Sequence, residues 1–276
     1  MKGVILAGGR GRRLKPFTNF LPKPMIPLMD QPLLEYTLRL LKNEGIDDVT
    51  LTVCYKKEKI INHIGDGSQF DMNISYIEET NPLGTAGSLF YHSEEFQDTL
   101  VVISGDALTN ISLRDAYHFH REKQALFTIV TVEVPDPEGL GICLTNHEGK
   151  LVSFLEKPAK NQIFSNKVNT GIYIINPELF RRYDFSGETD FAHDIFPALL
   201  KNNERVYVYH THAYWQDIGT PLQYAIAQKR LKSGIAGINT IFKAPSIPFQ
   251  NLSPGYLERF NFSHMYASGS ANVKKS

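Results

Sequence analysis

Glycine and arginine residues are concentrated directly after the first apolar run of the chain. That run ends in Leu6-Ala7, and Gly8-Gly9-Arg10-Gly11-Arg12-Arg13-Leu14 follows, with Pro22-Lys23-Pro24 further on. Glycine lets backbone N–H groups approach a phosphate chain without a Cβ in the way. Arginine is a permanently charged, multidentate partner for phosphate oxygens. The loop therefore predicts a polyphosphate site, with Lys23 as a further cation held between two stiffening prolines.

Two familiar phosphate-binding loops do not fit this segment. A P-loop requires Gly-Lys-Ser/Thr at its end, and none follows here. A dinucleotide fingerprint requires Gly-x-Gly-x-x-Gly, whereas the last position is Leu14. The remaining alternative is a surface loop with solvated arginines, which the added Pro-Lys-Pro segment disfavours.

Two aspartates stand where they could hold a divalent metal ion. Asp106 ends the apolar run that begins at Leu100, and Asp217 lies shortly before a predicted helix that starts at Pro221. Mg²⁺ prefers oxygen ligands and keeps several waters, so two converging carboxylates would leave positions for phosphate oxygens. The residues alone leave other roles open, with Asp106 as a turn residue and Asp217 as a cap of the following helix.

Two polar turns are candidates for recognising the organic parts of a substrate. Gly84-Thr85-Ala86-Gly87 opens a predicted helix and could line a slot for a nucleobase, with Thr85 as a plain helix cap as the alternative. Glu156-Lys157-Pro158 closes a predicted strand. Glutamate accepts hydrogen bonds from sugar hydroxyls and lysine binds phosphate, although a solvated ion pair fits the same residues.

Several histidines lie close in sequence to carboxylates or to one another, and we interpret them as solvent-facing side chains. They are His118 and His120 with Glu122 on the polar face of a predicted helix, and the pairs His193–Asp194 and His210–His212. The two cysteines, Cys54 and Cys143, lie far apart and form no zinc-binding pattern.

Apolar runs and amphipathic segments alternate through the first half of the chain. The pattern predicts strands at 4–7, 49–53, 74–77 and 100–103 and helices at 33–43, 57–64, 85–96 and 113–123. This alternation is typical of an α/β fold with a doubly wound, mostly parallel, Rossmann-like sheet. In such sheets ligands bind at the carboxyl ends of the strands, where the glycine loop and Asp106 are found.

The second half is richer in strands. The pattern predicts strands at 127–134, 142–145, 151–155, 168–175 and 206–209 and helices at 177–182, 191–201 and 221–232. Pro197 lies inside the second helix, which is therefore expected to kink or to begin late. Beyond residue 235 the periodicity decays, so we expect one domain over 1–235 and a peripheral or partly disordered tail over 236–276.

Composition and charge narrow the class of protein. The 29 basic residues balance 29 acidic ones, which removes the broad attraction that a non-specific nucleic-acid binder needs. No apolar run is long enough for a signal peptide or a membrane span. We therefore expect a cytoplasmic protein that acts on small molecules, with no nucleic-acid or membrane partner.

The glycine-rich loop, taken together with Pro22-Lys23-Pro24, Asp106 and Asp217, resembles the sugar-1-phosphate nucleotidyltransferase family. Its usual signature is Gly-Gly-x-Gly-Thr-Arg-Leu followed by Pro-Lys-Pro, and the resemblance runs from Met1 to about Lys232. Within the family, the chain is most similar to the bacterial mannose-1-phosphate guanylyltransferases, and Gly84-Thr85-Ala86-Gly87 resembles the form found in guanylyl and related transferases. One departure is Arg12, which replaces the usual threonine and adds charge to the loop.

The resemblance implies a role for each motif. It makes Asp106 and Asp217 the Mg²⁺ ligands, and with Arg13 and Lys23 they form the catalytic group. The implied nucleotide contacts, in a half at 1–125, are Leu6, Ala7, Gly8, Gly9, Gly11, Arg13, Gly84, Thr85 and Gly105. The implied sugar-phosphate contacts, in a β-rich half at 126–235, are Gly141, Glu156, Lys157, Asn169 and Thr170.

The function implied is condensation of a nucleoside triphosphate with a sugar 1-phosphate to give a nucleotide sugar for polysaccharide biosynthesis and pyrophosphate. GTP and mannose 1-phosphate, giving GDP-mannose, are the expected pair. A thymidylyl-, uridylyl- or cytidylyltransferase acting on glucose 1-phosphate or another sugar is the alternative. A regulatory subunit that binds a nucleotide sugar is the alternative of another class, and a homo-oligomer is a further possibility.

Overall fold

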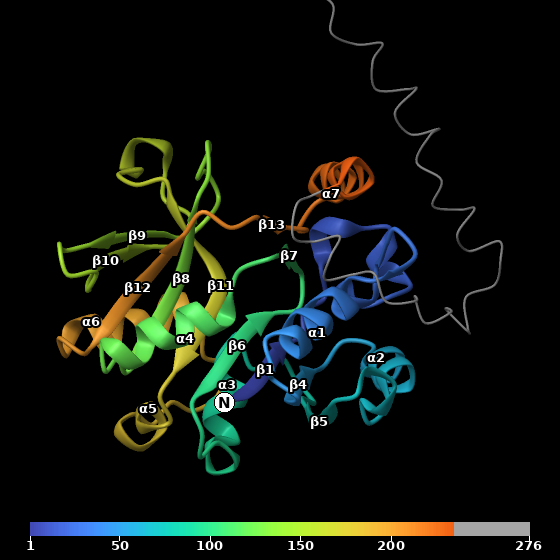
Figure 1. Ribbon diagram of the computed structural model, residues 1–276, viewed down its shortest axis with the longest axis horizontal. Helices are drawn as coiled ribbons and strands as arrows, with labels where there is room; N and C mark the ends of the chain where they lie inside the picture. The colour runs from blue at the N-terminus through green and yellow to red at the C-terminus, as the bar shows by residue number, and fades with distance from the viewer. Residues whose placement is uncertain (235–276) are drawn as a thin grey trace, which may run out of the picture. The chain divides into compact units, whose positions relative to one another are not determined.

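The computed structural model describes residues 1–234, so the tail predicted at 236–276 lies outside the described residues. Nine strands form one sheet at the centre of this part, in the order β10-β9-β11-β6-β1-β4-β5, with β8 paired to β11 and to β12 (Figure 1). The strands are β1 (Lys2–Leu6), β4 (Asp48–Val53), β5 (Asn73–Glu78), β6 (Leu100–Ser104), β8 (Phe127–Glu133), β9 (Ile142–Thr145), β10 (Leu151–Leu155), β11 (Lys167–Ile175) and β12 (Val206–Thr211).

The amino-terminal strands form the parallel part of the sheet. β1 pairs in parallel with both β4 and β6, and β4 pairs in parallel with β5. These strands read as continuous apolar runs because both of their faces are covered: Val4, Ile5 and Val102 have no exposed surface. Since parallel strands end at the same edge, the segments after β1, β5 and β6 lie together. The predicted α/β class with a mostly parallel central sheet is confirmed.

The sheet continues without a break into the second half of the chain. β11 pairs antiparallel with β6, placing Ile172 opposite Ile103, and on its other side it pairs with β8. β12 then pairs in parallel with β8. The two predicted halves therefore share one sheet, and their binding residues meet at its edge.

Helices cover the sheet largely where periodicity predicts them. They are α1 (Leu33–Asn43), α2 (Lys57–Ile64), α3 (Gly87–Tyr91), α4 (Leu113–Glu122), α5 (Glu178–Arg182), α6 (Phe196–Lys201) and α7 (Pro221–Ser233). In α1 the apolar stripe of Leu34, Leu38 and Leu41 has no exposed surface. α4 packs on β8 and β12, and α6 on β10 (Figure 1).

Two predicted helices differ from the observed ones. The helix predicted at 85–96 is shortened to α3. Its start moves to Gly87, because Ala86 and Gly87 donate backbone hydrogen bonds to the Thr189 carbonyl (2.9 and 3.2 Å), and beyond Tyr91 a separate 3₁₀ turn forms at Ser93–Glu95. The helix predicted at 191–201 begins with a wide π turn at Phe191–Ile195, and α6 follows with Pro197 in its first turn. The expected late start at that proline is confirmed.

The hydrophobic pattern of the sequence did not predict four short strands. β7 (Ala107–Thr109) and β13 (Trp215–Asp217) form a separate antiparallel ribbon, with Asp217 opposite Ala107. β2 (Pro27–Leu28) and β3 (Gln31–Pro32) form another ribbon. Strands of two or three residues bury too little to produce a readable period, yet the β7–β13 ribbon is what brings Asp217 beside Asp106.

The interpretation of His120 as a solvent-facing side chain is wrong. His120 is 3% exposed, and its Nδ1 lies 2.9 Å from the Thr128 hydroxyl on β8. Burial lowers its pKa to about 4, so it is a neutral core side chain.

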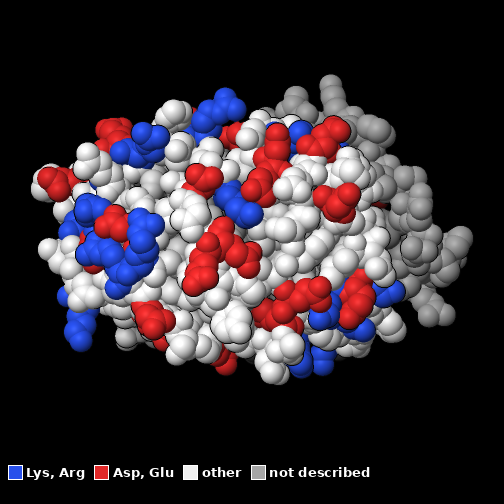
Figure 2. Space-filling view, turned by 90° about the horizontal axis from the view of Figure 1, so that it is seen from below, with Lys and Arg blue, Asp and Glu red and all other residues white. Residues whose placement is uncertain are grey.

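Acidic and basic side chains are intermixed on the face of the molecule in Figure 2, where a basic group at the left edge surrounds acidic side chains. Ion pairs in the described part include Lys57–Glu78 (2.8 Å) and Arg182–Glu204 (2.7 Å). Among the helices of residues 1–234, none combines the length and the apolar character needed to cross a bilayer.

Candidate active site

Lys23, Asp106 and Asp217 meet at the carboxyl edge of the sheet. The Lys23 ammonium lies 2.5 Å from Asp106 Oδ2 and 3.4 Å from Asp217 Oδ1. Lys23 is 8% exposed, whereas both aspartates are partly open to solvent. One buried positive charge thus bridges two carboxylates, which must lie within a few ångströms of each other.

Each of these residues is positioned by short local structure. Asp106 follows β6, and Ser104 at the end of β6 donates to Asp106 Oδ1 at 2.5 Å. Asp217 ends β13, and the next residue donates from its backbone N–H to the Asp106 carbonyl at 3.1 Å. Lys23 opens a 3₁₀ turn that contains Pro24. Asp217 is not a helix cap, because Thr220 caps α7 by accepting from the Gln223 N–H at 3.2 Å.

The pKa values of the two aspartates shift in opposite directions, although both carboxylates contact the same lysine. Burial acts to raise the pKa of Asp106, but the charge of Lys23 and its hydrogen bond outweigh burial and lower that pKa. Burial and the charge of Asp106 raise the pKa of Asp217, although Lys23 and Arg13 oppose them. Burial likewise acts to lower the pKa of Lys23, and the two carboxylates raise it. Asp106 is therefore the better-neutralised carboxylate.

The glycine loop packs its turn against Lys23. Gly11 has a φ of 58°, and a Cβ there would lie 2.9 Å from the Lys23 Cβ and from the Thr18 methyl. Thr18 also donates its hydroxyl to the Gly11 carbonyl at 3.0 Å. This left-handed turn therefore accepts only glycine without strain, and it fixes the loop over the lysine.

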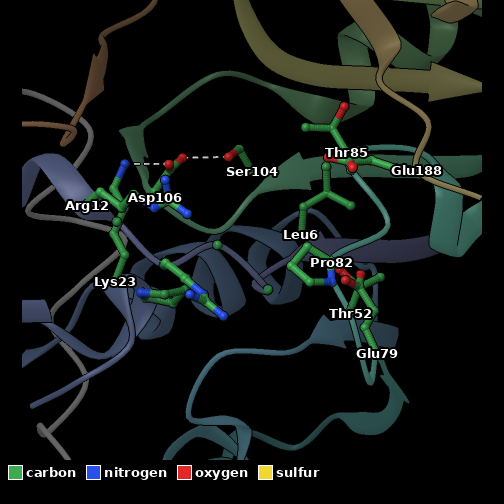
Figure 3. A pocket seen from close by; sticks show the side chains of 16 residues that line it. Leu6, Arg12, Lys23, Thr52, Glu79, Pro82, Thr85, Ser104, Asp106 and Glu188 are labelled. Carbon is green, nitrogen blue, oxygen red and sulfur yellow. Dashed lines mark hydrogen bonds and ion pairs between the residues drawn. The ribbon is translucent and has the colours of Figure 1, made fainter. Parts of the chain in front are cut away.

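A cavity of about 600 Å³ opens beside the glycine loop (Figure 3). Its walls come from the loop, the carboxyl ends of β1, β4, β5 and β6, and the turn before α3. The lining residues are Leu6, Gly8, Gly9, Arg10, Gly11, Arg12, Lys23, Pro24, Thr52, Glu79, Pro82, Gly84, Thr85, Ser104, Asp106 and Glu188. In Figure 3, Arg12, Lys23 and Asp106 stand together at one end, with Thr52, Glu79 and Pro82 at the other. A charged end and a flatter end suit a nucleoside triphosphate.

A second cavity of about 210 Å³ lies on the other side of Asp106. Its lining residues are Arg13, Ser104, Asp106, Ala107, Gly139, Leu140, Gly141, Glu156, Lys157, Asn169, Thr170, Gly171, Trp215 and Asp217. Ser104 and Asp106 line both cavities. Molecules held in the two cavities would therefore face each other across Asp106.

The structure places some predicted nucleotide contacts elsewhere. Ala7 and Gly105 line neither cavity: Ala7 is 1% exposed, and Gly105 donates its N–H to the Leu6 carbonyl at 3.0 Å. Arg13 lines the smaller cavity beside Asp217, while Arg12 lines the larger one. Thr85 does line the larger cavity, but it does not cap α3; its hydroxyl donates to Asp190 Oδ2 at 2.8 Å and accepts at 3.0 Å from the N–H of Phe191, the first residue of the π turn.

The five predicted sugar-phosphate contacts all line the smaller cavity. A Cβ on Gly141 would lie 2.7 Å from both Glu156 Oε2 and the Phe154 ring, so a larger residue there would displace these side chains. Glu156 and Lys157 form an ion pair at 3.1 Å. The Thr170 hydroxyl donates to the Val130 carbonyl at 2.8 Å, so this residue shapes the wall through its backbone.

Sequence analysis missed four polar residues of the larger cavity, namely Thr52, Glu79, Ser104 and Glu188. Glu79 follows β5, so the rule that singled out Asp106, a carboxylate at a strand end, would have found it. Glu79 is 8% exposed, receives a hydrogen bond from the Ser88 hydroxyl, and accepts from the Leu83 N–H at 3.2 Å. These two donors hold its carboxylate in place at the wall of the cavity.

Two curated relatives share most of this chain. A UTP–glucose-1-phosphate uridylyltransferase of Synechocystis sp. is 38% identical over 238 residues, which cover 81% of this chain and 61% of that protein. A mannose-1-phosphate guanylyltransferase of Mycobacterium tuberculosis is 34% identical over 235 residues, which cover 84% of this chain and 65% of that protein. The chain therefore spans less than two thirds of the length of these two relatives.

A solved structure has the same architecture. HddC from Yersinia pseudotuberculosis, crystallised with GMP-PN, aligns with a TM-score of 0.72 and 27% identity, over 83% of this chain and 99% of that one. The model of the nucleotidyl transferase family matches residues 2–234. This range includes the residues that line both cavities. The chain belongs to this nucleotidyl transferase family, and the resemblance to sugar-1-phosphate nucleotidyltransferases that its motifs indicated is confirmed.

Proposed function

We propose that the protein joins a nucleoside triphosphate to a sugar 1-phosphate, giving a nucleotide sugar and pyrophosphate. The observation that carries this proposal is that the two cavities share Asp106 and Ser104. The larger one has the basic loop and the room for a nucleotide. The smaller one combines cations, Arg13 and Lys157, with hydrogen-bonding groups on Glu156 and Asn169 that suit a phosphorylated sugar.

The reaction asks mainly for alignment and charge neutralisation. An oxygen of the sugar phosphate attacks the α-phosphorus, the bond from that phosphorus to the β-phosphate oxygen breaks, and pyrophosphate leaves with the electron pair. The attacking oxygen is already anionic, so no general base is needed. Arg12 and the loop N–H groups would hold the triphosphate, and Arg13 the sugar phosphate, so that two polyanions approach in line.

The residues around Lys23 fit a bound Mg²⁺. Asp106 and Asp217 present hard oxygen ligands, which Mg²⁺ prefers, on either side of the Lys23 ammonium. We propose that these two aspartates hold the ion. When bound, Mg²⁺ would neutralise charge on the phosphate oxygens. Lys23 keeps the carboxylates facing one another and adds a positive charge beside the reacting phosphates.

Glu79 favours GTP among the nucleotides. Guanine presents two adjacent donors, N1–H and the N2 amino group, to which a carboxylate can bind with both oxygens. Uracil and thymine present one N–H between two carbonyl oxygens, and those oxygens would face the Glu79 carboxylate unfavourably. Mannose 1-phosphate is the proposed partner because the guanylyltransferase relative acts on it. The 38% identity to a uridylyltransferase makes UTP with glucose 1-phosphate the second candidate.

The proposed activity is tested by measuring pyrophosphate release with Mg²⁺ for each nucleoside triphosphate against mannose, glucose and glucosamine 1-phosphates. We expect turnover with GTP and mannose 1-phosphate, and a loss of at least about a hundredfold in Asp106→Ala, since a group that stabilises the transition state is removed. Absence of turnover in every combination, in a folded protein that still binds nucleotide, would favour the regulatory subunit instead.

Substitution of Glu79 tests the role of this residue in base selection. Glutamine offers one acceptor and one donor, which match the N3–H and a carbonyl of uracil better than the two donors of guanine. Glu79→Gln should lower kcat/KM for GTP relative to UTP by about 10- to 100-fold, because a hydrogen bond to a charged group contributes ~1.5–3 kcal/mol. Glu188→Gln changes another carboxylate of the same cavity and is the matched control. An unchanged ratio in Glu79→Gln would contradict the assignment.

Opposite stability effects are expected at the two aspartates. Because the pKa of Asp217 is raised by folding, the free energy of unfolding falls as the pH rises from the unfolded-state pKa to the folded-state pKa, and this cost is complete at neutral pH. Asp217→Asn should therefore raise Tm at neutral pH. Asp106 has a lowered pKa, so its ionised form stabilises the fold, and this stability is lost only as the pH falls through the folded-state pKa. Asp106→Asn should therefore lower Tm. Thermal unfolding with EDTA and no nucleotide measures both. Shifts of the same sign would refute this electrostatic account of the pair.

A further inference from the structure

Three side chains with metal-binding atoms gather on the second half of the sheet, outside both cavities. Glu133 ends β8, His210 lies in β12, and His212 follows that strand. A ligand atom from each lies within 4.8 Å of those of the other two. None of the three residues lines the cavities of the candidate active site.

The register of the two strands explains why these side chains converge. The parallel pairing of β8 with β12 places Thr131 opposite His210 and Val132 opposite Thr211. The next step brings Glu133 level with His212. Since side chains alternate between the two faces of a strand, Thr131, Glu133, His210 and His212 share one face. The sheet, rather than a long loop, therefore sets the positions of the group.

His210 presents a nitrogen that lacks a hydrogen-bond partner. Its Nδ1 lies 3.3 Å from the Thr131 hydroxyl, and its buried Nε2 has no hydrogen bond. Glu133 Oε1 lies 3.8 Å from this Nε2, beyond hydrogen-bond distance. In the tautomer that donates from Nδ1 to Thr131, Nε2 carries a lone pair directed at the group, as in histidines oriented for metal binding by a second partner. A bound cation would satisfy this buried atom.

The distances are close to those of a metal site. Tetrahedral zinc with bonds of about 2.0–2.2 Å holds its ligand atoms roughly 3.3–3.6 Å apart. The ring of His212 stands at 82° to that of His210, with centroids 5.1 Å apart. Both Glu133 and His212 are exposed, so rotation of their side chains alone can close the remaining gap.

We propose that His210 Nε2, a ring nitrogen of His212 and a Glu133 oxygen bind one divalent transition-metal ion of the zinc class, with water completing the coordination. Two imidazoles and one carboxylate suit Zn²⁺ and its neighbours, whereas Mg²⁺ prefers oxygen ligands alone. The site is thus chemically distinct from the aspartate pair. Its metal would link the ends of β8 and β12. β12 ends at Thr211, four residues before Trp215, the first residue of the strand that carries Asp217.

One nearby cation opposes this binding. Lys167 on β11 lies opposite Glu133, and after burial its charge is the largest cause lowering the pKa of His210. The positive charge of Lys167 would repel a metal ion bound to this group. Replacement of Lys167 by glutamine should therefore tighten metal binding.

In the test, Zn²⁺ is titrated into the metal-free full chain in excess Mg²⁺, and binding is measured by calorimetry. The visible absorption spectrum of bound Co²⁺ serves as a check of the coordination geometry. We expect one tight site with tetrahedral Co²⁺ bands, retained in Asp106→Ala and lost in His210→Ala and His212→Ala. Thr131→Val should weaken affinity by about 10-fold, as for other groups that orient a ligand, and Lys167→Gln should strengthen it.

His212 is exposed at the end of its strand, so His212→Ala should keep the circular dichroism spectrum and Tm of the metal-free protein, which makes its result decisive. Unchanged Zn²⁺ affinity in His212→Ala, or loss of the site in Asp106→Ala, would overturn the proposal. Neither result depends on nucleotidyl transfer, so this test and that of the proposed function fail independently.

Discussion

The contact of the Lys23 ammonium with Asp106 and Asp217 is the interaction around which the candidate site is built. In the sequence, Lys23 is separated from Asp106 by 83 residues and from Asp217 by 194 residues. Leaving any of these charges alone in a partly buried place would be costly, so the three segments that supply them must come together. The proline-flanked turn, the end of β6 and the β7–β13 ribbon are the local structures that do so.

The same contact divides the space for substrates. A 600 Å³ cavity with the glycine loop lies on one side of Asp106, and a 210 Å³ cavity lined by the second half lies on the other. The continuous sheet through β6, β11 and β8 holds the two walls in register. In the proposed reaction the polyanions meet beside charged groups that the fold already holds in place, so little reorganisation is needed.

The sequence predicted those parts of the fold whose periodicity is set by burial. The bounds of α1 and α2 coincide with the prediction because their apolar stripes repeat at helical spacing. The start of α3 and the β7–β13 ribbon were not predictable in this way. They depend on distant partners, such as the Thr189 carbonyl that accepts from Gly87, and such contacts leave no local period.

The site was predictable to a similar degree. Glycine loops and strand-end aspartates are visible as residue types, so Lys23, Asp106 and Asp217 could be singled out. Other features follow from packing that the local sequence does not show. They are the position of Arg13 in the smaller cavity, the fixed orientation of the Glu79 carboxylate and the burial of His120. The pairing of His210 with Glu133 likewise requires the register of two strands.

The central claim is that the two substrates react directly with each other across Asp106. The most direct measurement is the configuration at the α-phosphorus when a nucleoside triphosphate carrying sulfur there, as a single diastereomer, is converted to the nucleotide sugar. One in-line displacement predicts inversion of that configuration. Retention would show two displacements through a covalent nucleotidyl-enzyme intermediate and would contradict the account.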